Sequence, residues 1–307
     1  MTIDQPVQFA EIPAAMPLEE LKKDIAGMSE GGPVARQGTL DVYIAPAGEI
    51  PNILLEIGRL REVTFRAVGE GTGKERDLDR HDDLYLHLFL WDREEERIAG
   101  AYRMACTDVI FKEHGFQGLY TASLCECDQA LLDYLNPALE LGRSWIRPEY
   151  QKSLHSLLGL WKGIGQFVAQ NPRYHKLFGA VSISDDYTSI SQNLIVRFLR
   201  RTATHPTWSE RIRALMPFLD KPEELSSGLQ SIDEVSAEVS SHEADGKGVP
   251  VLLRQYFKMN ATLLDFAYDP NFMHCLDALV LVDLKEAPAR LLKKYMGKEG
   301  YESFIAS

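Results

Sequence analysis

The amino-acid sequence predicts an α/β protein with one large domain. Its 307 residues exceed an average domain, but α/β folds of roughly 200 to 250 residues often form a single unit. Hydrophobic residues make up 45% of the chain and charged residues 25%, which is typical of globular proteins. Between residues 139 and 201, segments with strand periodicity alternate with segments with helical periodicity. This alternation indicates strands and helices packed in layers.

The first half of the chain predicts a strand, a long helix and a hairpin. Residues 40–45 alternate as a strand, and residues 49–68 place five aliphatic side chains on one helical face: Ile50, Ile53, Leu54, Ile57 and Leu60. Glycines at 69, 71 and 73 end this helix. Residues 84–91 predict a strand covered on both faces, and after a charged turn residues 97–107 form the returning arm.

The second half predicts two strand–helix pairs and two late strands. After an irregular, partly helical stretch at 110–136, residues 139–146 and 176–183 predict strands, followed by helices at 153–170 and 189–201. Ser153 can cap the first of these helices, which Asn171-Pro172 ends. Residues 204–248 are rich in Ser, Glu and Asp and are not expected to form a core, whereas 249–269 and 277–283 return to strand-like patterns.

Charge and cysteine content restrict the class of protein. Lys and Arg number 33 against 45 Asp and Glu, and the net charge of −12 disfavours nucleic-acid binding over the whole surface. No apolar run approaches the length of about 18 residues that a membrane span needs, and we expect no secretory signal. The four cysteines, Cys106, Cys125, Cys127 and Cys275, contain no CxxC pair, so we expect no disulfide framework and no metal site. These observations favour a cytoplasmic enzyme.

Several motifs resemble a known family. They are His87-Leu, Glu140-Leu-Gly-Arg-Ser144, Leu158-x-x-Trp161-x-Gly-Ile164, the segment from Leu177 to Tyr187, and Asp269-Pro-Asn-Phe272. Together with the order of elements they resemble the hemolysin-like branch of GNAT acyltransferases, which includes ornithine-lipid and glycine-lipid N-acyltransferases. The resemblance covers about residues 40–285. It implies a central mixed, twisted sheet flanked by helices, with a polar or helical insertion at 204–248 before the last strands. Residues 1–39 are then an N-terminal arm or tail, with a helical hint at 17–28, and residues 286–307 a C-terminal helix or tail.

A more distant likeness is to acyl-homoserine-lactone synthases, which transfer an acyl chain to an amine. Arg61-x-x-x-Phe65 and Glu140-x-x-Arg143 are similar to spacings of those synthases. Asp79, Asp82 and Asp83 compete for the position of their acidic pair. The likeness implies that Arg61, Phe65, Asp82 and Asp83 bind the acceptor.

Acyl transfer to an amine needs a base, because only the neutral amine attacks a thioester. Glu140, inside an apolar strand, is the candidate base, and we expect Arg143 to hold either the amino-acid carboxylate or Glu140 itself; the alternative is that the two form only a structural ion pair. A regular strand would place these two side chains on opposite faces, so we expect a bulge at Gly142. His87 either orients the amine and shuttles a proton or is a satisfied core histidine. In the family, a residue at the position of Tyr187 can protonate the leaving thiolate.

The loop before the helix at 153 suggests the acyl donor. GNAT enzymes that use acetyl-CoA have a glycine-rich loop here for the pyrophosphate, but residues 150–155 contain no glycine. This favours acyl carrier protein, whose phosphopantetheine thioester has a single phosphate, over acyl-CoA. We expect the donor to contact Gly142, Ser144, Trp145, Ile146, Lys152, Ser153 and Ser184. A basic face could dock the acidic carrier or, alternatively, anionic lipid: Lys152, Lys162, Arg173, Lys176, Arg197, Arg200 and Arg201.

The sequence therefore predicts an N-acyltransferase that moves a long-chain fatty acyl group from acyl carrier protein or acyl-CoA to the α-amine of an amino acid. No tightly bound cofactor is expected. Because the product is a lipid, we expect peripheral contact with the inner face of the membrane. The rival hypotheses are acyl-CoA-dependent transfer to another amine or a hydroxyl, and a catalytically inactive GNAT module that binds a lipid or a partner.

Overall fold

The computed structural model describes residues 9–28, 32–219 and 228–307, and the chain divides into two compact units. Unit 1 comprises Met1–Met104, Arg143–Gln166 and Asn271–Met273, and unit 2 comprises Ala105–Gly142, Phe167–Pro270 and His274–Ser307. Strands β4 (Arg97–Cys106) and β6 (Leu139–Ile146) and helix α5 (Leu154–Gln170) each contribute residues to both units.

Unit 1 is built on antiparallel strands. β1 (Ala35–Gln37), β2 (Leu40–Pro46), β3 (Leu86–Asp92) and β4 are neighbours in that order, with Val42 opposite Leu90 and Leu88 opposite Tyr102. Val42, Leu88 and Leu90 are fully buried. Gly163 of α5 allows this packing, because a Cβ there would lie 2.6 Å from Leu88 Cδ1. The glycine in the Leu158–Ile164 motif therefore has a packing role.

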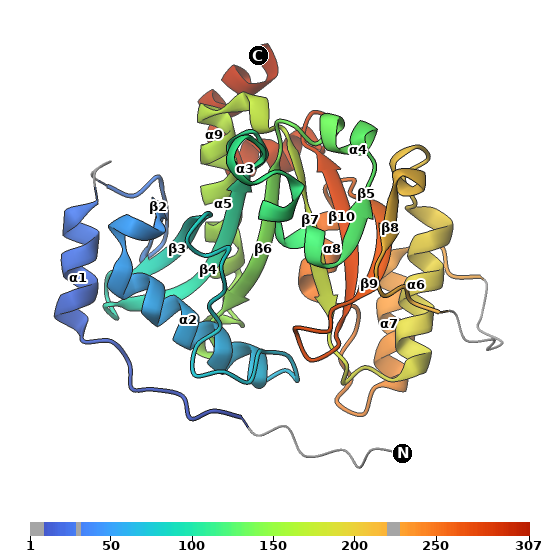
Figure 1. Ribbon diagram of the computed structural model, residues 1–307, viewed down its shortest axis with the longest axis horizontal. Helices are drawn as coiled ribbons and strands as arrows, with labels where there is room; N and C mark the ends of the chain where they lie inside the picture. Colours follow the sequence, from blue (N-terminus) through green and yellow to red (C-terminus); the bar gives the residue numbers. More distant parts are fainter. Residues whose placement is uncertain (1–8, 29–31, 220–227) are drawn as a thin grey trace. The chain divides into compact units, whose positions relative to one another are not determined.

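Two helices of unit 1 are joined through a side-chain cap. α1 (Leu18–Gly27) lies beside α2 (Pro51–Arg66) (Figure 1). Asp24 Oδ2 accepts hydrogen bonds from the backbone N–H groups of Asn52 (2.7 Å) and Ile53 (2.9 Å) at the start of α2. A carboxylate at this end satisfies unpaired N–H groups and is favoured by the helix dipole.

Unit 2 contains the other half of the strands. β6, β7 (Lys176–Ile183), β10 (Leu276–Asp283) and β9 (Thr262–Tyr268) are neighbours in that order. β10 is antiparallel to both β7 and β9, but β6 and β7 pair in parallel only at Leu139–Leu177 and Glu140–Phe178. A second small sheet joins β5 (Cys125–Cys127) to β8 (Ile212–Ala214). In the described part of this unit, the helices besides the end of α5 are α3 (Thr107–His114), α4 (Gln129–Tyr134), α6 (Ser189–Thr202), α7 (Ile232–His242), α8 (Val251–Phe257) and α9 (Ala289–Ala306).

The strands and helices agree with the predicted mixed α/β architecture, and the bounds of β6 and β7 agree with the expected strands. No helix in the described part of the chain has both the length and the apolar character needed to cross a bilayer. Two local predictions are wrong. Residues Val251–Phe257 form helix α8 rather than a strand, with Leu253 and Tyr256 buried three residues apart. The polar stretch 204–248 does contribute core, because Val235 and Val239 of α7 are fully buried beside α6.

Gly179 of β7 allows the backbones of β6 and β7 to approach closely. Its φ is +151°, and a Cβ there would lie 2.1 Å from the carbonyl oxygen of Leu141, a backbone atom that cannot rotate away. We expect Gly179→Ala to lower the free energy of unfolding by about 2 to 3 kcal/mol, measured by urea denaturation. Gly142→Ala is the matched control on the neighbouring strand, since a Cβ there meets nothing within 4 Å. Equal stability of the two variants would show that the strands can separate without cost.

Candidate active site

Unit 1 contains a buried cluster of three arginines and three aspartates, here called the arginine–aspartate cluster: Arg61, Asp77, Asp79, Asp82, Arg103 and Arg143. Arg61 comes from α2, Arg103 from β4 and Arg143 from β6, and the aspartates lie in the loop that follows α2. The three positive and three negative formal charges cancel. Each buried charge therefore has a partner, which offsets the cost of removing it from water.

The arginines share the three carboxylates. Arg61 donates from Nε to Asp77 Oδ2 (3.1 Å) and from Nη1 to Asp82 Oδ1 (2.7 Å). Arg103 Nη1 lies 2.7 Å from Asp79 Oδ1 and 3.2 Å from Asp82 Oδ1. Each aspartate thus faces at least one guanidinium, and the loop is fixed to two secondary-structure elements.

Arg143 completes the cluster from a distorted strand. Its φ is +51°, so the irregularity expected at Gly142 lies one residue later. Arg143 Nε lies 3.1 Å from Asp77 Oδ2, and its guanidinium lies 4.3 Å from the ring centre of Phe272. Phe65 packs edge-on against the same Phe272 ring at 5.0 Å. The predicted residue Phe65 therefore supports the ring that covers Arg143.

One end of the cluster is more open than the rest. The side chain of Asp79 is 24% exposed, against 1% for Asp77 and 3% for Asp82. Burial disfavours the charge of Asp79, but a hydrogen bond from His81 and the charges of Arg103 and Arg143 hold the pKa of Asp79 well below its usual range. Burial acts in the same way on Asp82, and Arg61 and Arg103 nevertheless lower the pKa of Asp82 to about 2. Asp79 is thus ionised and partly exposed at one end of the cluster. The predicted acceptor residue Asp83 is exposed to solvent.

His87 lies on β3 and is 1% exposed. Its Nε2 is 2.8 Å from the backbone oxygen of Asp82, which fixes the ring against the loop of the cluster. Burial lowers the pKa of His87 to about 4, and the hydrogen bond to Asp82 opposes this only in part. The imidazole is therefore neutral at neutral pH, which agrees with a satisfied core histidine; its predicted role in proton transfer stays a prediction.

The His87 pKa predicts a loss of stability in mild acid. As the pH falls below 6.5, the unfolded chain takes up the proton and the folded chain does not until about pH 4. Stability present above pH 6.5 is therefore lost progressively down to about pH 4, by about 3 kcal/mol from this group. Urea denaturation at a series of pH values measures the free energy of unfolding. In His87→Gln, the part of its decrease that His87 causes between pH 6.5 and pH 4 should be missing. An unchanged slope would mean that other groups cause the acid sensitivity.

Glu140 lies on β6 in unit 2 and is 2% exposed. Its carboxylate accepts three hydrogen bonds from the short turn η3 (Tyr120–Ser123): the N–H of Tyr120 at 3.0 Å, and the N–H (2.7 Å) and hydroxyl of Thr121. The hydroxyl of Tyr120 in turn donates to Asp269. A buried carboxylate with donors to both of its oxygens is held in one orientation.

The predicted donor-binding residues lie on β6 and at the start of α5. Trp145 is 3% exposed, and its indole N–H has no hydrogen-bond partner among the described residues. Lys152 is exposed, and Ser153 Oγ accepts from His155 N–H (3.2 Å), which is the expected helix cap. In the turn after β7, Ser184 donates to Asp186, and the Tyr187 hydroxyl donates to the oxygen of Gly248 (2.7 Å).

One residue of the predicted basic face is largely buried. Lys176 is only 9% exposed, because its ammonium group donates to the carbonyl oxygen of Tyr134 and lies over the ring of that residue. Arg173 is paired with Asp108 at 3.4 Å, and Arg200 donates to the backbone oxygen of Phe218. Lys176 therefore cannot be part of a carrier-docking surface in this conformation.

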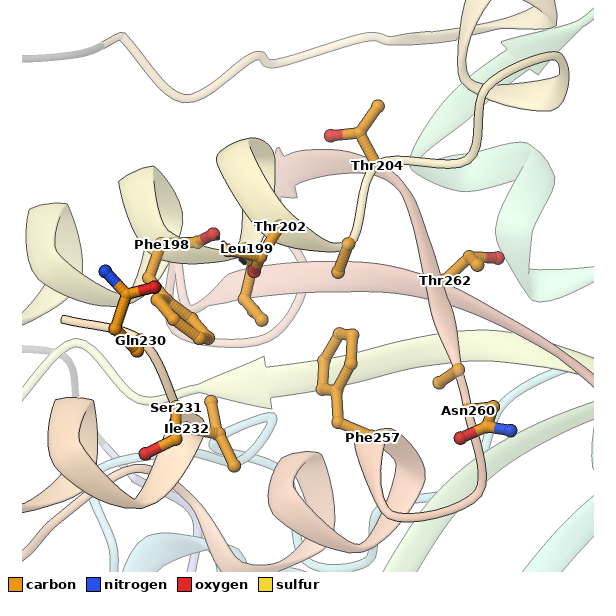
Figure 2. Close-up of a pocket in the computed structure, with 12 residues that line it drawn as sticks. Phe198, Leu199, Thr202, Thr204, Gln230, Ser231, Ile232, Phe257, Asn260 and Thr262 are labelled. Atoms are coloured by element: carbon orange, nitrogen blue, oxygen red, sulfur yellow. Dashed lines mark hydrogen bonds between the residues drawn. The ribbon is translucent and has the colours of Figure 1, made fainter. Parts of the chain in front are cut away.

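A hollow of about 400 Å³ lies elsewhere in unit 2, between the end of α6, the start of α7 and the end of α8 (Figure 2). Aromatic and aliphatic side chains line it, among them Phe198 and Phe257, with hydroxyl and amide groups such as Thr202 and Asn260 around them. None of the predicted site residues lines this hollow.

Sequence reasoning missed five residues of the arginine–aspartate cluster and of the surroundings of Glu140: Asp77, Arg103, Tyr120, Thr121, and Phe272 as the ring that covers Arg143. Arg103 carries a signal that could have been used, because it is a charged residue inside an otherwise apolar strand. Thr121 lies in an irregular stretch and shows no distinctive pattern.

Comparison with known proteins identifies the family. An acetyltransferase (GNAT) domain family matches residues 60–162. The chain is 30% identical to a glycine N(alpha)-acyltransferase of Phocaeicola vulgatus, over 76% of each chain. It is 37% identical to a glycine N(alpha)-acyltransferase of Bacteroides thetaiotaomicron, over 52% of this chain and 51% of the relative. An L-ornithine N(alpha)-acyltransferase of Brucella abortus is 24% identical, over 85% of this chain and 90% of the relative.

Among solved structures, a CoA-dependent acyl-homoserine lactone synthase is similar over 87% of this chain and 99% of its own, with a TM-score of 0.41 and 11% identity. The Phocaeicola vulgatus relative and the GNAT domain match indicate the same family. The chain therefore belongs to the GNAT-fold N-acyltransferase family that includes these glycine and ornithine N(alpha)-acyltransferases, and it is an acyltransferase.

Proposed function

We propose that this enzyme transfers a long-chain fatty acyl group from a thioester donor to the α-amine of a free amino acid, with Glu140 as the base. The observation that carries the proposal is the Glu140 carboxylate, which is buried and oriented by three hydrogen bonds inside a strand. A carboxylate so placed has the geometry of a proton acceptor. The names of the relatives, which are glycine and ornithine N(alpha)-acyltransferases, support an amino-acid acceptor.

The reaction is a direct displacement. Glu140 takes one proton from the substrate ammonium, and the freed nitrogen lone pair attacks the thioester carbonyl carbon. The C–S bond then breaks as the amide forms, and the second proton leaving the nitrogen neutralises the thiolate, with Tyr187 as the proposed relay. This scheme needs no covalent enzyme intermediate.

The arginine–aspartate cluster is the proposed acceptor-binding region, through Arg61 and Asp82 with Phe65 supporting it. Asp79 and Arg143 form its more exposed end, with side chains 24% and 9% exposed. Among the described residues, buried Arg61 Nη2 and Asp77 Oδ1 have no hydrogen-bond partner. A guanidinium donor and a carboxylate acceptor match the carboxylate and ammonium groups of an α-amino acid. Asp83 is exposed and takes no part in this proposal.

Acyl carrier protein is the proposed donor, because the loop before α5 contains no glycine between Tyr150 and His155. Lys152 and the capped start of α5 would meet its phosphate. A long-chain product would partition into lipid, and three exposed apolar side chains in one short segment support peripheral membrane contact: Leu215 (51%), Met216 (41%) and Leu219 (77%).

The test is a mass-spectrometric scan for N-acylated products. The protein is incubated with palmitoyl carrier protein or palmitoyl-CoA and a pool of amino acids. In a parallel sample lipid vesicles are added and then sedimented, to measure how much protein binds to them. We expect a long-chain N-acyl amino acid, faster product formation with the carrier-bound donor, and protein in the vesicle pellet. Folded protein that gives no product from either donor would refute the free amino-acid acceptor. In that case transfer to a hydroxyl or a lipid amine becomes the leading hypothesis.

A further inference from the structure

We propose that Thr121 is a positioning residue for Glu140: it fixes the carboxylate and exchanges donor and acceptor roles with it when the proton is transferred. The inference rests on the proposed function, in which Glu140 is the base. It concerns a side chain that has no counterpart among the predicted site residues.

Thr121 makes two hydrogen bonds to Glu140. Its N–H (2.7 Å) and its hydroxyl both reach Oε1, while Tyr120 N–H reaches Oε2 at 3.0 Å. Thr121 is 4% exposed, so water does not compete freely for these bonds. Both oxygens of the carboxylate are thus held by consecutive residues of one turn.

The turn itself is fixed from behind. The carbonyl oxygen of Thr121 accepts from Leu124 N–H (3.0 Å) and from the buried Cys125 thiol (3.3 Å). Ser123 Oγ donates to the oxygen of Tyr120 (2.7 Å), and the Tyr120 hydroxyl donates to Asp269. Thr121 therefore cannot follow Glu140 if that side chain moves, which is the property required of a positioning residue.

The two groups that Thr121 presents behave differently during the reaction. A backbone N–H can only donate, and it suits the ionised carboxylate. A hydroxyl can donate or accept. When Glu140 gains a proton on Oε1, that O–H can donate to Thr121 Oγ1 after the threonine hydroxyl rotates its own hydrogen away. One side chain thus satisfies both protonation states of the base, and no additional proton donor is needed.

The experiment compares Thr121→Val with Thr121→Ser. Valine keeps the shape and the N–H but removes the hydroxyl, so kcat should fall about 10- to 100-fold, the loss expected for a hydrogen bond to a charged group. The acid limb of the kcat/KM profile should move to higher pH, because the carboxylate form loses a donor. KM for the acyl donor should change less than twofold. Serine should restore both the rate and the position of the acid limb.

Thr107→Val is the matched control. Thr107 is fully buried in the same unit, and among the described residues its hydroxyl bonds only to backbone groups: it donates to the oxygens of Leu135 (2.7 Å) and Ala138 (3.2 Å) and accepts from Ala138 N–H (2.8 Å). This variant should lower the melting temperature and leave the pH profile in place. A wild-type rate and pH profile in Thr121→Val, or the same profile change in both valine variants, would overturn the proposal.

A readout that does not depend on turnover separates this inference from the proposed function. The ¹³C signal of the Glu140 carboxyl group, assigned by its absence in Glu140→Gln, is titrated in wild type and Thr121→Val. A midpoint that moves to higher pH in the valine variant supports the coupling even if wild type transfers no acyl group, the result that refutes the proposed function. An unchanged midpoint overturns the inference even if the enzyme is active.

Discussion

Glu140→Gln should lower kcat/KM for acyl transfer by about 100- to 10,000-fold, the range over which general bases contribute. Glutamine has nearly the same shape but cannot take a proton from the ammonium group. Its amide NH₂ would also face a backbone donor, because Tyr120 and Thr121 donate to both oxygens of Glu140. The initial rate of thiol release with a saturating acyl donor measures the effect.

Two comparisons show whether the loss is chemical. Activity of Glu140→Gln should rise with pH more steeply than that of wild type, because the fraction of neutral amine increases without a base. Glu140→Asp keeps the carboxylate but withdraws it from Thr121, so its rate should lie between the two. A Glu140→Gln variant with wild-type kcat/KM and normal thermal stability would restrict Glu140 to a structural role.

Arg61→Met should lower the free energy of unfolding by about 3 to 5 kcal/mol, the usual cost of removing one partner of a buried charge pair. Arg61 is 1% exposed and holds Asp77 and Asp82, which are 1% and 3% exposed. Methionine replaces its apolar volume but leaves two buried carboxylates with fewer cationic partners. Urea denaturation at neutral pH measures the loss.

An exposed ion pair gives the control for this measurement. Arg213 and Glu126 are paired with 79% and 59% of their side chains exposed. Arg213→Met should change the free energy of unfolding by less than about 1 kcal/mol, because solvent screens such pairs. If Arg61→Met were as mild as Arg213→Met, water would have to enter the arginine–aspartate cluster and replace the guanidinium.

The sequence predicts the elements with clear periodicity and misses those decided by tertiary contacts. Strand β6 agrees with its predicted bounds, because Arg147-Pro148 ends the strand-like segment. The sequence predicts a strand where helix α8 lies, since a seven-residue, mostly apolar segment fits both periods. The polar composition around α7 concealed Val235 and Val239, whose burial depends on the neighbouring helix α6.

The two clusters show the same division. Glu140 could be selected from the sequence because a charge inside an apolar strand is unusual, and Arg61 through the likeness to acyl-homoserine-lactone synthases. Their partners could not, because Asp77 and Thr121 lie 16 and 19 residues away in irregular segments. Distance along the chain carries no information about which carboxylate or hydroxyl will reach a given arginine or glutamate. Only the path of the loop after α2 and of turn η3 determines this.

The contacts of the N-terminal arm bear on how a shorter version of the protein would behave. A fragment that begins at residue 40 would lack Asp24, whose carboxylate caps the first turn of α2, and Met16, whose N–H donates to Glu56 at 3.0 Å. The start of that helix would then rely on water to satisfy its N–H groups. Because Arg61 is on the same helix, fraying could spread toward the arginine–aspartate cluster. Expression vectors for this protein should therefore retain the arm and place purification tags elsewhere.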